Sequence, residues 1–155
     1  MAQSIERLDL SAYDVILVSS SGFAHGVITK PESKTIVYYH APARYMWDWT
    51  NEYKRDIGAQ IGIKGYILNR LFLKLRLWDF IASKHHDITL ANSATTAKRL
   101  QKYFRLESEI VYPPIETARF SKKISNTFLN PFPFQGQGAT NYYITLSALT
   151  EFKRI

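Results

Sequence analysis

Short apolar runs alternate along the chain with longer segments in which apolar residues recur every three or four positions. The short runs are rich in β-branched residues and are bounded by Ser, Gly, Pro or Asp, which is typical of buried strands. They predict strands at Asp14–Ser20, Lys34–His40, Asp87–Ser93 and Ser108–Pro114. The longer segments predict helices at Tyr45–Tyr53, in the region after Gly65, and at Ala94–Phe104.

The helical region after Gly65 carries a long apolar stripe. Its members are Ile67, Leu68, Leu71, Phe72, Leu75, Trp78 and Ile81. The basic residues Arg70, Lys74 and Lys84 lie off this stripe. Packing on a sheet is the common use of such a stripe, whereas basic side chains beside apolar ones also suit docking on an anionic membrane. Both uses stay open, for different faces of the same helix.

Strands that alternate with helices predict a parallel sheet with helices on its faces. We therefore expect an α/β fold of the Rossmann-like kind. Ligands of such sheets bind outside the carboxyl ends of the strands. The segments that follow the four strands are SSSGFAHG, HAPARYMWD, NSATT and PPIETARF. They are rich in small, polar and aromatic residues, so we expect them to line a binding crevice.

His40, at the end of the second predicted strand, is the first candidate for that crevice. A histidine can exchange a proton near neutral pH or form a hydrogen bond with a sugar hydroxyl or a phosphate, although a purely structural histidine fits as well. Nearby, Arg44 offers a clamp for anions. Trp47 and Trp49 offer apolar faces on which a sugar ring can stack.

Other candidates have a simple structural explanation beside a functional one. Ser21 and Gly22 form a turn without a phosphate-loop pattern. This turn either lets a substrate approach the backbone closely or is a plain tight turn. Ser93 can cap the helix that follows or help to bind an anion. His85 and His86 have no cysteine and no carboxylate triad nearby, which favours a solvated helix end over a metal site.

Composition narrows the classes of protein. The chain has 155 residues, 46% of them hydrophobic, enough for one domain with a real core. The absence of cysteine excludes disulfides and cysteine-ligated zinc and fits a reducing compartment. No apolar run is long enough to span a bilayer, and the N-terminus lacks the order of a signal peptide. The net charge of +7 suits nucleic acid, acidic lipid headgroups or phosphorylated small molecules.

Five segments together resemble one family. They are YDVILVSSSGFAHGVI, YYHAPARYMWD, LRLWDFIASKHHDITLANSATTAKRLQKYF, VYPPIETARF and YYITLSALTEFKR. Their order and spacing are similar to the middle of GT-B fold glycosyltransferases of family 4, especially the bacterial mannosyltransferase-like branch that builds surface polysaccharides. The resemblance covers nearly the whole chain except the stretch 121–140.

The resemblance implies a retaining transferase that moves a sugar, commonly from GDP-mannose, to a lipid-linked or growing saccharide without a metal cofactor. It implies that His40 lies beside the transferred sugar and that Arg44, Tyr45, Trp47 and Asp48 shape the cleft. Asn92 and Ser93 match the pair that opens the next helix, and Lys153 matches a residue that clamps the donor diphosphate. It also implies a cytoplasmic location, with peripheral attachment to the inner face of the membrane as a further expectation.

The chain departs from the family pattern in two respects. Ala148 stands where the partner arginine of the diphosphate clamp is expected. The family's Gly-rich first strand and its glutamate-bearing donor site are also not in the sequence. We therefore expect residues 1–120 to be part of an acceptor-side domain, 121–140 a linker and 141–155 the beginning of a donor-binding domain, with its first strand at Asn141–Ser147. This chain alone is expected to be inactive.

Two other functions fit parts of the sequence. A non-catalytic remnant that binds a membrane or a protein partner would dock through residues 65–84. A basic nucleic-acid-binding module would use the positive charge and the many aromatic residues. The basic residues are scattered and no nucleic-acid-binding motif occurs, so we expect no nucleic acid among the partners.

Overall fold

A computed structural model describes residues 2–116 of the protein. It begins with the short helix α1 (Ala2–Glu6), strand β1 (Val15–Ser20), the 3-10 turn η1 (Ala24–Gly26) and strand β2 (Lys34–Tyr39). Helices α2 (Thr50–Asp56) and α3 (Gly62–Ala82) follow, and then strand β3 (Ile88–Ala91), helix α4 (Ala94–Phe104) and the short strand β4 (Glu109–Ile110). The four described strands lie where the apolar runs predict them.

The strands form one parallel sheet in the order β1-β2-β3-β4. The expected α/β, Rossmann-like architecture is therefore confirmed. Ser20 pairs with Tyr39, and Tyr39 pairs with Ala91, so the last residues of three strands are in line. This register brings the segments that follow the strands to one edge of the sheet.

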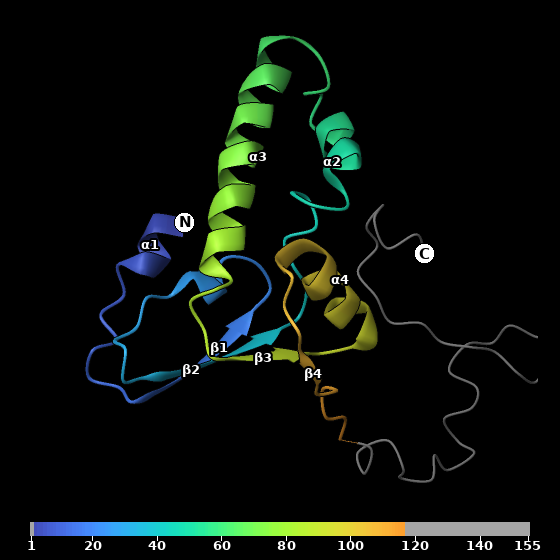
Figure 1. The fold of residues 1–155 in the computed structure, drawn as a ribbon. Helices are drawn as coiled ribbons and strands as arrows, with labels where there is room; N and C mark the ends of the chain where they lie inside the picture. Colours follow the sequence, from blue (N-terminus) through green and yellow to red (C-terminus); the bar gives the residue numbers. More distant parts are fainter. Residues whose placement is uncertain (1, 117–155) are drawn as a thin grey trace, which may run out of the picture. The chain divides into compact units, whose positions relative to one another are not determined.

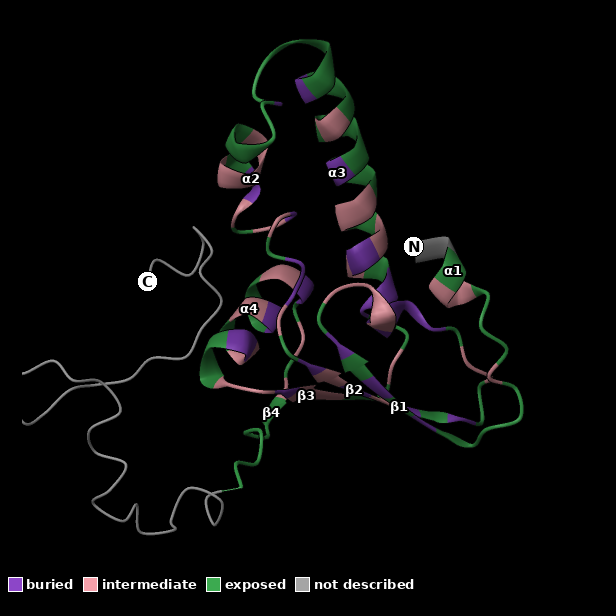
Figure 2. Ribbon diagram, turned by 180° about the vertical axis from the view of Figure 1, so that it is seen from behind, coloured by how far each residue is buried: buried purple, intermediate pink, exposed green. Residues whose placement is uncertain are grey.

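All four described helices lie on the same side of the sheet (Figure 1, and Figure 2 from behind). The strand order explains this arrangement. Each new strand is added on the same side of the one before it, and right-handed crossovers then carry every connecting segment over the same face. Among residues 2–116, no helix covers the opposite face of the sheet, which we call the open face, and Val15 and Leu17 are exposed on it.

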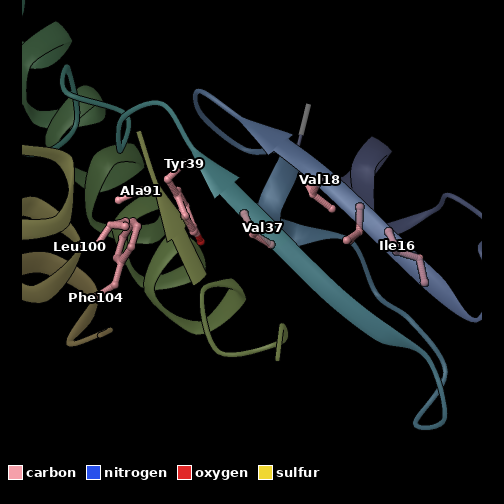
Figure 3. Close-up of a cluster of buried hydrophobic side chains, with 8 residues drawn as sticks. Ile16, Val18, Val37, Tyr39, Ala91, Leu100 and Phe104 are labelled. Carbon is pink, nitrogen blue, oxygen red and sulfur yellow. The ribbon is translucent and has the colours of Figure 1, made fainter. Parts of the chain in front are cut away.

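The main core lies between the sheet and α4. Every second residue of β1 and β2 points into it, and the helix contributes Leu100 and Phe104. The close-up in Figure 3 shows these side chains, which are Ile16, Val18, Val37, Tyr39, Ala91, Leu100 and Phe104. A second, smaller cluster of Ala43, Met46 and Phe72 joins α3 to the loop that follows β2.

Two helical predictions need correction. The helix expected at Tyr45–Tyr53 begins only at Thr50, and residues 44–49 form turns. The Met46 carbonyl accepts a hydrogen bond from Arg76 Nε, 2.5 Å away, and is turned toward α3 rather than along a helix axis. In α3, the predicted apolar stripe is only partly buried. Phe72 is buried, whereas Ile67 and Ile81 are more than half exposed.

The chain divides into two compact units, Met1–Pro114 and Ile115–Ile155. The first unit holds every helix and strand described above. The expected linker at 121–140, the strand expected from Asn141, and Ala148 lie outside the described residues.

Candidate functional site

The candidate site lies at the carboxyl edge of the sheet. The His40 amide donates to the Ser20 carbonyl at 2.8 Å, and the Asn92 amide donates to the Tyr39 carbonyl at 3.1 Å. Ladder pairing thus continues one residue beyond the strands. As a result, His40 and Asn92 begin their loops from adjacent, fixed positions.

The His40 side chain is exposed and held by its neighbours. Its Nε2 atom lies 2.9 Å from the Ser19 hydroxyl on the adjacent strand. The Tyr38 ring meets the imidazole edge-on, with 5.2 Å between ring centroids. Ser19 and Tyr38 both belong to the open face of the sheet, since their paired neighbours along the strands point into the core. The imidazole is therefore held at this edge while remaining accessible to a ligand.

Thr96 joins the ends of β2 and β3. Its hydroxyl lies 3.0 Å from the His40 carbonyl and 2.7 Å from the Asn92 Oδ1 atom. Ser93 Oγ accepts from the Thr96 amide at 3.2 Å, so the predicted cap of α4 is confirmed. Thr96 therefore joins the backbone of His40 to the side chains of Asn92 and Ser93, all three expected in the site, while the imidazole of His40 is held separately by Ser19.

The loop after β2 contains a small network of charges. Asp48 lies 3.4 Å from Arg44 Nε and 3.1 Å from Arg99 Nε on α4. Arg44 also lies 5.8 Å from the centre of the Trp49 ring. Two cations share one carboxylate, so the network keeps an excess positive charge. Because Arg44 is half exposed, this charge is available to an anionic ligand.

Two residues of the same loop point into the protein. The Trp47 ring stacks on Tyr103 with 5.0 Å between centroids, and its indole nitrogen donates to Asp79 Oδ2 at 2.7 Å. Tyr45 packs against Tyr53 and Phe72. Burial, with the nearby charge of Asp79, raises the pKa of the Tyr45 hydroxyl. These two side chains fix the loop on the protein, and one face of the Trp47 ring is covered by Tyr103.

Asp79 connects several elements beneath the site. This buried residue of α3 places Oδ1 3.2 Å from Nε2 of His25, which is also buried. The other ring nitrogen of His25 lies 3.4 Å from the Ser20 hydroxyl. Ser20, His25 and Asp79 resemble a proton-relay arrangement, but all three are at most 1% exposed. A substrate cannot reach them, and Asp79 holds the loop after β2 through its hydrogen bond with Trp47.

The turn after β1 is open. A Cβ added at Gly22 would meet no atom within 4 Å. Ser21 is exposed, and Gly22 has partial exposure. The space that a ligand would need beside this backbone is therefore present.

The sequence indicates Ser19 and Thr96 only as members of the expected crevice segments SSSGFAHG and NSATT, and it does not indicate Arg99. The sequence position of Thr96 could have indicated its role, because it lies three residues after the helix cap Ser93. A side chain there can reach back to the end of the preceding strand. Ser19 and Arg99 make contacts that depend on strand register and helix placement. Lys153, expected at the donor diphosphate, lies outside the described residues.

The sequence predicts that His85 and His86 lie at a solvated helix end, but only His85 is exposed. His86 is half-buried, its ring lies 5.8 Å from the Tyr39 ring, and its Nε2 atom is 2.9 Å from the Thr89 hydroxyl. Burial, with the nearby charges of His25 and Lys84, lowers the pKa of His86 to about 4. His85 is exposed, as expected.

Among residues 2–116, no group of three or more His, Cys, Asp or Glu side chains could hold a metal ion. Within the same residues, no helix combines the length and the hydrophobicity needed to cross a membrane. Comparisons with protein families, with curated proteins and with solved structures found no match.

Proposed function

We propose that the described domain is the acceptor-side domain of a retaining glycosyltransferase. The enzyme would move a sugar, expected to be mannose, from a nucleotide-sugar donor such as GDP-mannose to a lipid-linked or polysaccharide acceptor. The proposal rests on the resemblance of the sequence to GT-B glycosyltransferases and on the geometry of the sheet edge. The observation that carries it is the joint anchoring of His40, Asn92 and Ser93 through Thr96.

The chemistry of this edge suits a sugar. Sugar hydroxyls need donors and acceptors that are already held in position, because each ordered side chain then loses little entropy on binding. His40 is oriented by Ser19, and the Asn92 side chain is oriented by Ser93 and Thr96. The open space beside Gly22 leaves room for a ring close to the backbone.

In the proposed reaction, the bond between the anomeric carbon and the nucleotide phosphate oxygen breaks. An acceptor hydroxyl oxygen forms the new bond to that carbon with retention of configuration and loses its proton. The nucleoside diphosphate leaves with the bonding electron pair. His40 would form a hydrogen bond with the sugar that is transferred, and Arg44 would attract an anionic group of the acceptor or donor. Lys153 would contact the diphosphate, and no metal cofactor is proposed.

A saccharide titration tests this function on the chain as it exists. The amide resonances of the ¹⁵N-labelled protein are followed while methyl α-mannoside is added, and then, separately, GDP-mannose. The mannoside is expected to shift the amides of Ser21, Gly22, His40, Asn92 and Ser93. His40→Ala should weaken this binding about tenfold, the equivalent of one hydrogen bond of about 1.4 kcal/mol.

His85→Ala is the matched control, because it removes an exposed histidine that precedes β3, at the edge of the sheet opposite to the site. It should leave the mannoside affinity unchanged. If the mannoside shifts none of these amides, or if both alanine variants bind it equally well, the proposed function is wrong.

A further inference from the structure

Helix α3 has an apolar surface on the side that does not contact the protein. The buried side follows Gly65, Phe72 and Asp79 at helical spacing. The opposite side carries large apolar residues, each between 51% and 80% exposed. They are Ile63, Tyr66, Ile67, Leu73, Leu77 and Ile81. A helix that is apolar on all sides is normally covered on all sides, so the exposed side indicates a binding surface.

The surface continues over the loop before the helix. Ile57 and Ile61, both in this loop, are 48% and 90% exposed. Figure 1 shows that α3 extends away from the sheet, and in Figure 2 most of the loop before it and much of its distal end are coloured as exposed. We call these eight residues the outer α3 surface. Because it projects from the rest of the domain, it can approach a flat partner without a clash from the sheet.

The charges beside this surface are all positive. Between Ile57 and Trp78 the sequence contains Lys64, Arg70, Lys74 and Arg76 and no acidic residue. Arg76 is turned inward, where it donates to the Met46 carbonyl and the Thr50 hydroxyl. Lys64, Arg70 and Lys74 are exposed and have no salt bridge within the described part of the chain. Three solvated cations thus lie among the apolar residues.

This combination selects one class of partner. A second copy packed on the same surface would place these cations against one another without a carboxylate to pair them, which is unfavourable. A bilayer that contains anionic lipids satisfies both features, because its acyl region takes the aliphatic side chains and its headgroups pair with Lys and Arg. We propose that the outer α3 surface docks the domain on an anionic membrane, with Lys64, Arg70 and Lys74 at the headgroups.

Vesicle flotation with the full chain tests the docking. Vesicles of phosphatidylcholine alone are compared with vesicles that also contain phosphatidylglycerol. The protein should float with the anionic vesicles, bind the neutral ones much more weakly, and be released as the salt concentration rises. Arg70→Glu with Lys74→Glu should lower the partition coefficient about tenfold or more. Ile63→Ser with Leu73→Ser should also abolish flotation, because it removes the apolar contacts.

Lys98→Glu with Lys102→Glu on α4 is the matched control, since it makes the same change of charge on another exposed helix face. This variant should still bind the anionic vesicles nearly as well as the wild type does. Circular dichroism melting confirms that each variant is folded, as substitutions at exposed positions leave stability nearly unchanged.

Equal flotation of the α3 and α4 charge variants would overturn the proposal, because binding would then depend on total charge alone. Absence of flotation by the wild-type chain would overturn it as well. In that case, a dimer in solution that Leu73→Ser disrupts would identify a second copy as the partner. The docking is independent of the saccharide site, so the α3 variants should bind methyl α-mannoside as the wild type does.

Discussion

The side chains of Ser19 and His40 are hydrogen-bonded across two neighbouring strands, with 2.9 Å between Oγ and Nε2. The backbone of His40 is held separately, by the Ser20 carbonyl and the Thr96 hydroxyl. The orientation of the imidazole ring and the position of the residue therefore depend on different partners. A substitution at Ser19 can alter the first without the second.

Ser19→Ala should change the environment of His40 Nε2 while the domain stays folded. The hydrogen bond is exposed, so we expect a loss of stability of less than about 1 kcal/mol. The ¹⁵N chemical shift of Nε2, measured in ¹H–¹⁵N correlation spectra of the imidazole, should move and the mannoside affinity should fall. Ser21→Ala is the control in the adjacent turn, and it should leave the Nε2 shift as it is. A shift that is the same in wild type and Ser19→Ala would contradict the hydrogen bond.

Asp79→Ala should destabilise the domain strongly. The substitution leaves the Trp47 indole N–H without its acceptor and removes the carboxylate that lies 3.2 Å from the buried His25 ring. Loss of a hydrogen-bond acceptor that leaves a buried donor unsatisfied costs about 1–3 kcal/mol. Urea unfolding followed by tryptophan fluorescence measures the change. Asp14→Ala breaks the exposed pair with Lys30 and should cost less than about 1 kcal/mol. Similar losses in the two variants would show that the Asp79 network does not support the loop.

Two glycines near the site should respond differently to alanine. A Cβ at Gly26 would collide with the Trp78 ring, which is held by a 2.5 Å hydrogen bond from its indole nitrogen to Glu6. Gly26→Ala should therefore cost about 1–3 kcal/mol as an overpacking substitution. Gly22→Ala should stay within about 0.5 kcal/mol of wild type, because the added methyl group meets open space. Thermal melting compares the two variants, and an equal loss in both would contradict the packing around Trp78.

Stability should fall in mild acid because of His86. Its pKa is about 4 in the folded protein, whereas an unfolded histidine titrates near 6.5. The unfolded chain therefore binds a proton that the folded chain excludes as the pH falls from about 6.5 to about 4, and the free energy of unfolding decreases over this window. His86→Asn should flatten this dependence, as measured by urea unfolding at several pH values. His85→Asn changes an exposed neighbour and should keep the wild-type slope. Equal slopes in all three proteins would refute the assignment.

The sequence is most informative where a local signal agrees with the global fold. It predicts the helix Ala94–Phe104 with its observed bounds, because Ser93 caps this helix and Phe104 closes its apolar side. The four strands follow from short β-branched runs. Strand β4 is shorter than its apolar run predicts. Only Glu109 and Ile110 are paired, both are exposed, and two prolines follow.

Sequence-based expectations are wrong where contacts distant in sequence decide the structure. The loop at 44–49 has helical spacing, but Arg76 draws the Met46 carbonyl away from a helix axis. The apolar stripe predicted for α3 is too wide. Phe72 is buried against the loop after β2, whereas Ile67 and Ile81 are more than half exposed. The sequence also does not indicate that Tyr103 stacks on the Trp47 ring or that Asp79 accepts a hydrogen bond from its indole nitrogen.

The strand order of the sheet has a consequence for biosynthesis. Each strand pairs with the strand that was synthesised before it, so no later strand has to be inserted between two that are already paired. A chain emerging from the ribosome can therefore add β2 to β1, β3 to β2 and β4 to β3 in the order of translation. Helix α4 comes after β3 and supplies Leu100 and Phe104 to the core. We expect β1, β2 and β3 to pair in register before this helix closes over them.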